Sequence, residues 1–127
     1  MQHMNNEELA YMNSCANEYY EGLDNEKKRS YIKSMLNHDL MKVKFTKVNG
    51  DEREMFCTLT NEYIPEDKEY RDGSGRKKNM DVLAVFDIEK RDWRSFRIEN
   101  VVDFAIVRTE DLNFQVETNI HYQDVPF

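Results

Sequence analysis

The spacing of apolar residues changes from a helical period to a strand period near residue 41. Before that point two stripes recur every three or four residues, which places each stripe on one face of a helix. We therefore predict two helices within residues 5–39. Gly22 suits the break between them, and Asp24 is a suitable N-cap for the second helix. The stripes are Leu9, Met12, Ala16, Tyr19 and Tyr20, then Tyr31, Ile32, Met35, Leu36 and Leu40.

From residue 41 onward apolar and polar residues alternate, as they do in strands with one buried face. The runs "MKVKFTKV" and "EMFCTLT" flank Asn49-Gly50, a dipeptide typical of a tight hairpin turn. The runs "DVLAVFDI" and "WRSFRI" follow, joined by "EKRD", and "VVDFAIV" comes after them. Helices first and strands afterwards predict an α+β fold, in which two N-terminal helices precede a small, strongly bent antiparallel sheet or barrel of five or six strands.

The chain has 127 residues, of which 39% are hydrophobic, and this suits one compact domain. We divide it into an N-terminal helical segment (residues 1–40), a barrel (residues 41–108) and a C-terminal extension (residues 109–127). Phe114, Val116, Thr118 and Ile120 alternate in the extension as an added strand would. No apolar run is long enough to cross a bilayer and the N-terminus lacks signal-peptide features, so we expect an intracellular protein without membrane contact.

Basic residues gather in two places, although the formal net charge is −7. That acidic balance disfavours a general grip on phosphate backbones. The polar stretch between two predicted strands, "NEYIPEDKEYRDGSGRKKNM", is long for a loop, and such loops tend to be functional or mobile. The second place is Arg94-Ser95-Phe96-Arg97, next to the single tryptophan, Trp93. The basic residues of the loop are Lys68, Arg71, Arg76, Lys77 and Lys78.

Alternation along "WRSFRI" turns Phe96 and Ile98 toward the core and lets Arg94 emerge at the rim of the barrel. Trp93 and Arg97 then share the outer face, where we expect the guanidinium to stack on the indole. Arginine suits phosphate and an exposed tryptophan suits a base, so this segment is a candidate nucleotide site.

The alternative is purely structural. In it, Arg97 shields Trp93 and pairs with Glu99 or Asp92, and Arg94 pairs with Asp87. Such surface pairs contribute no more than about 1 kcal/mol each.

Two stretches of the chain, "MKVKFTKVNGDEREMFCTLTNEYIP" and "VLAVFDIEKRDWRSFRIENVVDF", resemble the small SH3-like or Sm-like barrel proteins of tailed bacteriophages, a group related to the WYL domains of bacterial regulators. The likeness spans residues 41–104. It implies an SH3-like barrel that acts in the cytoplasm of an infected bacterium, with virion association left open.

The same resemblance implies binding of nucleic acids or nucleotide-like ligands near an Arg-x-Phe-Arg segment, which Arg94, Phe96 and Arg97 match. The family's Trp-Tyr-Leu triplet is replaced by Asp81-Val82-Leu83, and Asn100 stands where an arginine is expected.

No motif specifies a reaction. The chain has no nucleophile elbow and no phosphate-binding P-loop, and His3, His38 and His121 lie in three separate segments. Cys15 and Cys57 are far apart and form no metal-ligand spacing. We expect no enzymatic activity, no cofactor, no metal and reduced thiols.

Two function classes remain. In the first, the protein is a phage accessory factor that binds nucleic acid or a nucleotide through Trp93, Arg94, Arg97, Arg71, Arg76, Lys77 and Lys78. In the second, it is a phage protein-interaction factor, either a host-protein modulator or an assembly component. It would then dock through its helices and acidic surface at Tyr19, Tyr31 and Met35. The sequence leaves the ligand, the host or phage partner, and the choice between monomer and homodimer open.

Overall fold

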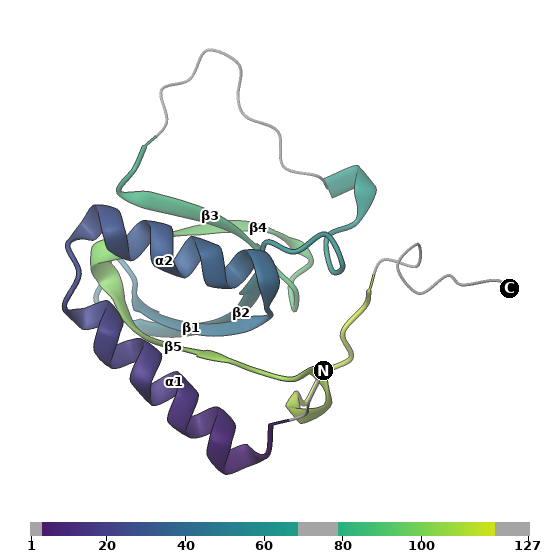
Figure 1. The fold of residues 1–127 in the computed structure, drawn as a ribbon. Coiled ribbons are helices and arrows are strands. Elements are labelled where there is room, and N and C mark those ends of the chain that lie inside the picture. The colour runs from purple at the N-terminus through teal and green to yellow at the C-terminus, as the bar shows by residue number, and fades with distance from the viewer. Residues whose placement is uncertain (1–3, 69–78, 119–127) are drawn as a thin grey trace, which may run out of the picture.

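The computed structural model describes residues 4–68 and 79–118 (Figure 1). Two helices precede five strands, as the sequence predicts. The elements in order are α1 (Asn6–Glu21), α2 (Asn25–His38), β1 (Met41–Thr46), β2 (Glu52–Thr58), the 3-10 turn η1 (Glu66–Lys68), β3 (Val82–Asp87), β4 (Asp92–Arg97), η2 (Ile98–Asn100), β5 (Val101–Ile106) and η3 (Thr109–Asp111).

Both helices begin at capping residues. The Asn5 side chain accepts a hydrogen bond from the Glu8 N–H at 2.8 Å, and the Glu8 carboxylate accepts one from the Asn5 N–H at 2.9 Å. This reciprocal pair is a capping box. Asp24 caps α2 by accepting from the Lys27 N–H at 2.9 Å. Gly22 caps the end of α1, so the predicted boundary between the helices is confirmed.

The five strands form one antiparallel sheet in the order β4-β3-β2-β1-β5. The Asn49-Gly50 turn joins β1 to β2, and Gly50 has a positive φ of 95°, which glycine adopts without strain. Turn η2 carries the chain from β4 on one edge of the sheet to β5 on the other. In the described residues the strongly curved sheet is not closed by β4–β5 pairing.

The main core lies between the helices and one face of the sheet. Ile32 and Leu36 of α2 are fully buried against Val43 and Met55, and Phe104 joins them from β5. Figure 1 shows α2 lying over the curved sheet and α1 running beside β5. A second apolar cluster gathers around Leu40, Ile64, Phe86 and Ile88. Because side chains alternate along a strand, Phe86 faces away from Val85, which belongs to the main core.

Two asparagines on α1 bind the free edge of β5. Asn13 Oδ1 accepts from the Ile106 N–H at 2.8 Å, and Asn13 Nδ2 donates to the Ile106 carbonyl at 3.2 Å. Asn17 makes the same two bonds with Phe104, at 3.1 and 2.7 Å. The helix therefore satisfies backbone groups that a sixth strand would otherwise pair with.

The described part of the C-terminal extension differs from the expected strand. Residues 112–118 are irregular after η3. Leu112, Phe114 and Val116 instead pack against the second apolar cluster, and the Phe114 ring meets Phe56 edge-on at 5.5 Å. A strand would have turned alternate side chains to solvent at a sheet edge, whereas this packing shields the cluster. Ile120 lies outside the described residues.

Candidate ligand-binding pocket

A pocket of about 560 Å³ opens where the β1–β2 hairpin faces the second half of β4. Its wall carries four basic residues, Lys47, Arg53, Arg94 and Arg97. The remaining lining residues are Phe45, Thr46, Val48, Asn49, Met55, Val82, Ser95, Phe96 and Asn100.

The floor of the pocket is aromatic. The rings of Phe45 and Phe96 stack with centroids 5.6 Å apart and planes inclined by 28°. Both side chains are buried members of the main core, and Met55 lies beside them. The pocket is thus the place where the core face of the sheet reaches solvent.

Arg94 and Arg97 come from β4, which pairs with β3 along its whole length, with Arg94 opposite Val85 and Arg97 opposite Val82. Both arginines are exposed, while Phe96 between them is buried. The predicted emergence of Arg94 at the rim is confirmed. Neither guanidinium is in an ion pair within the described part of the chain, so both are available to an anion.

Arg53 is held differently, by an ion pair with the buried Asp87. Arg53 Nη2 lies 3.6 Å from Asp87 Oδ2. The other carboxylate oxygen of Asp87 accepts the backbone N–H groups of Glu89 and Lys90, both at 3.0 Å. This arrangement fixes the β3–β4 turn and points the Arg53 side chain across the sheet.

The expected surface pairs of the arginines do not form, which corrects the structural alternative. Asp87 is taken by Arg53 because it sits at the turn, whereas Arg94 lies further along β4 opposite Val85. Asp92 lies 3.8 Å from Lys68 Nζ rather than beside Arg97.

Trp93 does not join the pocket, and the predicted stacking of Arg97 on its indole is wrong. Residues four apart on a strand are separated by roughly 13 Å, too far for such a contact. Trp93 is half-buried, meets Phe86 edge-on at 5.7 Å and donates from Nε1 to the Lys68 carbonyl. Its ring therefore supports the second apolar cluster.

The other predicted binding residues, Arg71, Arg76, Lys77 and Lys78, lie outside the described residues. Sequence reasoning missed Lys47 and Arg53. Arg53 could have been found from the sequence. It lies two and four residues before the buried Met55 and Cys57, so it is a charged residue on the core-facing side of its strand. Lys47 gave no such signal, since it lies in a hairpin turn.

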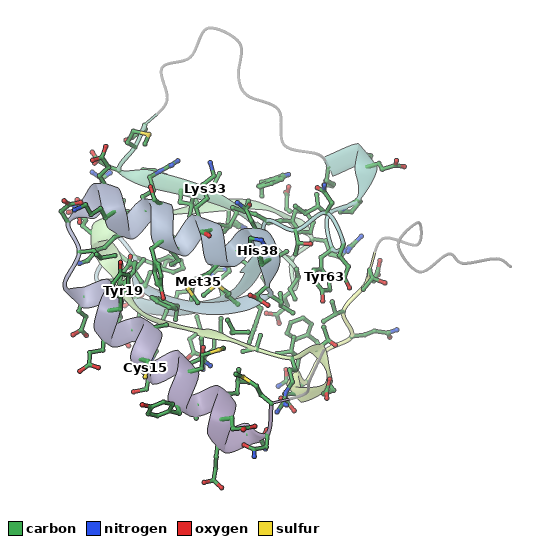
Figure 2. The ribbon with its side chains drawn as sticks, in the orientation of Figure 1. Cys15, Tyr19, Lys33, Met35, His38 and Tyr63 are labelled. Carbon is green, nitrogen blue, oxygen red and sulfur yellow. The ribbon has the colours of Figure 1, made fainter. Side chains whose placement is uncertain are left out.

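The predicted docking residues lie together on the helical face. Tyr31, Met35 and Cys15 line a groove of about 310 Å³ between α1 and α2. The Tyr19 ring is exposed and tilts against Tyr31 at 5.1 Å. Figure 2 shows Met35 between the helices, with Cys15 and Tyr19 on α1.

Residues 4–68 and 79–118 contain no group of three His, Cys, Asp or Glu side chains that could hold a metal ion. In the same ranges no helix is long and apolar enough to cross a membrane.

A model of the family described as WYL_2, Sm-like SH3 beta-barrel fold, matches residues 25–102, from the start of α2 to the first residues of β5. The chain belongs to the WYL_2 family. The phage resemblance is supported by a relative in Enterobacteria phage T4, described as an uncharacterized 11.5 kDa protein in the Gp31-cd intergenic region. The two are 29% identical over 85 residues, which cover 66% of this chain and 83% of the relative. Comparison with solved structures gives no match.

The WYL_2 match extends the resemblance seen in the sequence, which covered residues 41–104, to include α2. Helix α1 and the C-terminal extension lie outside it. All four basic residues of the pocket lie inside the matched range. The pocket is therefore part of the WYL_2 domain itself.

Proposed function

We propose that this WYL_2 protein is a non-enzymatic phage accessory protein that binds a nucleotide or single-stranded nucleic acid in the basic pocket. The observation that carries the proposal is that Arg94 and Arg97, both exposed and without an ion-pair partner among the described residues, line the same pocket as the stacked Phe45 and Phe96 rings. It would act in the cytoplasm of the infected bacterium.

The chemistry of the wall suits a phosphate. A guanidinium offers a planar set of donors that bind two phosphate oxygens at once, and Lys47 adds a point charge at the hairpin. The floor formed by Phe45, Phe96 and Met55 is apolar, which suits the flat face of a base. A volume of about 560 Å³ falls within the usual range of small-molecule sites.

Arg53 has a supporting role in this proposal. Because Asp87 already offsets its charge, Arg53 contributes less to the field than the two free arginines of β4. Its tether keeps the guanidinium at the pocket wall. Because the net charge of the chain is −7, affinity for a nucleic acid depends on this local basic patch. Salt screens the charges of the patch, so affinity should be highest at low salt.

The test is fluorescence anisotropy of a labelled oligothymidylate, competed with unlabelled ATP, for the full chain and for Arg94→Glu, Arg97→Glu. We expect affinity that falls steeply with salt and a loss of at least tenfold in the double variant. Lys27→Glu, Lys90→Glu is the matched control, because both lysines are exposed and the change in net charge is the same. Equal affinity of the two double variants would refute the proposal.

A second function, docking of a host or phage protein on the helical face, is favoured by one observation. Helix α1 contains four glutamates and no lysine or arginine, and it exposes Tyr11 and Tyr19 beside the groove that Tyr31 and Met35 line. Affinity capture from nuclease-treated host extract tests it. A partner retained by the full chain and lost in Tyr19→Glu, Met35→Glu would support docking, and retention in that variant would exclude this face.

A further inference from the structure

Arg29 of α2 is a buried arginine without a carboxylate partner. The residue is only 7% exposed, and it takes part in none of the ion pairs of the described chain. Its Nε donates to the Val82 carbonyl at 3.3 Å, and no other hydrogen bond of Arg29 occurs among the described residues. Arginine is almost never buried unpaired, because removing a charge from water is costly. A bound anion would offset this cost.

The two Nη groups of Arg29 can be reached from outside. Among the described residues, the Tyr20 hydroxyl is the one fully enclosed side-chain nitrogen or oxygen that lacks a hydrogen-bond partner. The Nη groups bond nothing, so they are not fully enclosed and must touch solvent. Because so little of the residue is exposed, the guanidinium lies at the bottom of a narrow opening.

Strand β2 leaves one side of the first half of β3 unpaired. The ladder between the two strands contains only the pairs Cys57–Asp87 and Thr58–Phe86. The Thr60 N–H, which would continue the ladder, donates instead to Thr58 Oγ1 at 3.1 Å. The side of β3 that faces away from β4 is therefore open before Phe86.

Helix α2 lies along this open side of β3. Arg29 bonds the Val82 carbonyl at the start of β3, and the Leu36 carbonyl accepts the Leu59 N–H at 2.9 Å just past the end of β2. Lys33 lies between these two contacts on the helix, so it is placed beside the middle of β3. Figure 2 shows Lys33 on the side of α2 toward β3.

The N–H of Ala84 is unpaired at this place. The Ile98 N–H donates to the Asp81 carbonyl at 2.9 Å, so alternation directs the odd-numbered residues of β3 to β4 and turns Val82 and Ala84 toward α2. No hydrogen bond of the Ala84 backbone occurs within the described chain. The Val82 carbonyl that holds Arg29 and the Ala84 N–H are consecutive groups on this side of the strand.

Lys33 adds a second cation without a partner. It is half-buried, and no carboxylate of the described chain pairs with it. It follows Arg29 by four residues on the same face of α2, and like charges at this spacing repel each other. Glu26 and Asp81 come close in sequence, but both are exposed and neither pairs with Arg29 or Lys33.

We propose that Arg29, Lys33 and the Ala84 N–H bind one phosphate group between α2 and β3. The guanidinium and the ammonium offset the charge of the phosphate, and the backbone N–H donates to a further oxygen. None of these three residues lines the basic pocket, so the site is separate from it and does not rest on the proposed function. Val82 lies next to both sites, because its side chain lines the pocket and its carbonyl holds Arg29.

The first experiment is NMR of the full chain labelled with ¹⁵N-alanine and titrated with inorganic phosphate at constant ionic strength. The alanines of the chain are Ala10, Ala16, Ala84 and Ala105, so each gives one amide signal. We expect a saturable shift of the Ala84 signal, while the signals of Ala10 and Ala16 on α1 stay in place. Absence of a saturable shift at Ala84 would overturn the proposal.

Lys33→Gln and Lys27→Gln form a matched pair, because both remove one charge from the same helix and Lys27 is exposed. Phosphate affinity should fall about tenfold in Lys33→Gln, as expected for the loss of one hydrogen bond to a charged group. It should stay unchanged in Lys27→Gln. Equal affinity of the two variants would rule out Lys33 as a ligand and with it the site.

Arg29→Met distinguishes an anion site from a structural arginine. Methionine keeps an unbranched side chain and removes the charge, so the Ala84 shift should disappear. Dilute phosphate should raise the unfolding temperature of the unmodified protein and of Lys27→Gln, but not of Arg29→Met. A methionine variant that keeps the Ala84 shift would overturn the proposal. If this variant does not fold, the comparison of Lys33→Gln with Lys27→Gln decides alone.

Arg94→Glu, Arg97→Glu separates this site from the basic pocket. The Ala84 shift with phosphate should persist in that double variant, even where oligothymidylate binding is lost. A shift that disappears would place the phosphate in the pocket and overturn the proposal. Titration of the unmodified chain with unlabelled oligothymidylate then identifies the source of the phosphate. A shift with the oligonucleotide indicates the backbone of a nucleic acid, and a shift with inorganic phosphate alone indicates a free phosphate group.

Discussion

Asn17 binds the backbone of Phe104 through both ends of its amide, accepting from the N–H at 3.1 Å and donating to the carbonyl at 2.7 Å. Asn13 repeats the pattern at Ile106, four residues earlier on the helix and two residues later on the strand. The match arises because four helical residues rise about 6 Å and two strand residues rise about 6.7 Å. A helix thus completes the edge of the sheet.

Replacement of Asn17 by alanine tests this edge. The change leaves the Phe104 N–H and carbonyl without a partner in a partly buried position, and we expect it to lower the free energy of unfolding by about 1–3 kcal/mol. Urea unfolding followed by circular dichroism measures the loss. Ser14→Ala, on the exposed side of the same helix, should be neutral or slightly stabilising. Similar losses in the two variants would show that the amide bonds add nothing to stability.

A substitution at Tyr20 should leave the free energy of unfolding unchanged or raise it, in contrast to the loss expected at Asn17. Its ring packs edge-on against Phe104 at 5.0 Å, but its buried hydroxyl has no hydrogen-bond partner among the described residues. Tyr20→Phe keeps the ring and removes the unsatisfied group, so the free energy of unfolding should stay the same or rise by up to about 1 kcal/mol. Tyr20→Ala should instead cost about 3–5 kcal/mol through the cavity it leaves. A clear loss in the phenylalanine variant, measured by urea unfolding, would reveal a hidden partner for the hydroxyl.

The helices, their boundary and the strand order along the chain were predictable because each rests on local chemistry. Asp24 and Gly22 mark helix ends by capping, and Asn49-Gly50 marks a turn by its preference for positive φ. The role of Asn13 and Asn17 was not predictable. Both are ordinary polar residues on a helix, and their partners are about 90 residues away in sequence.

The candidate site was predictable only in part, because strand alternation is local chemistry and the curvature of the sheet is not. Alternation along β4 placed Arg94 and Phe96 on one face, and the structure agrees. Alternation says nothing about distance along the strand, so the stack of Arg97 on Trp93 was a false inference. The contribution of Arg53 and Lys47 depends on how the β1–β2 hairpin curls toward β4, which is a property of the folded sheet.

Alkaline pH should weaken the fold through Cys57. Burial, and next the nearby negative charge of Asp87, raise the pKa of this fully buried thiol. An unfolded cysteine ionises near pH 8.5, so stability is fully present below that pH and is lost as pH rises toward the raised folded value, by up to about 1.4 kcal/mol per pH unit.

Urea unfolding on both sides of that pH tests the prediction, with Cys57→Val as the control. The valine variant should show a flatter profile between that pH and the onset of tyrosine ionisation, whatever its stability at neutral pH. Burial raises the pKa of Tyr20 to about 12, so Tyr20 adds its own loss only above about pH 10, where the unfolded phenol ionises. Parallel profiles for the two proteins would exclude the thiol as the source.

The ion pair between Arg53 and Asp87 contributes to the stability of the domain and also holds a residue of the proposed binding pocket. Asp87 is buried and accepts two turn N–H groups, so Asp87→Ala should cost more than about 2 kcal/mol, because both donors and the arginine lose their partner. Asp87→Asn keeps an acceptor for the turn and removes only the charge. A double-mutant cycle of Asp87→Asn with Arg53→Gln isolates the pair, and at 3.6 Å with Arg53 partly exposed we expect coupling at the lower end of about 0.5–3 kcal/mol.

The same two single variants should change ligand binding in opposite directions, although both lower stability. Asp87→Asn removes a negative charge and releases the Arg53 guanidinium, so it should bind the labelled oligothymidylate more tightly than the unmodified protein and with a steeper salt dependence. Arg53→Gln should bind more weakly while unfolding with a similar loss of stability. Anisotropy titrations at two salt concentrations measure both. If the two variants shifted affinity in the same direction, Arg53 would act on the pocket through the β3–β4 turn and not through its charge.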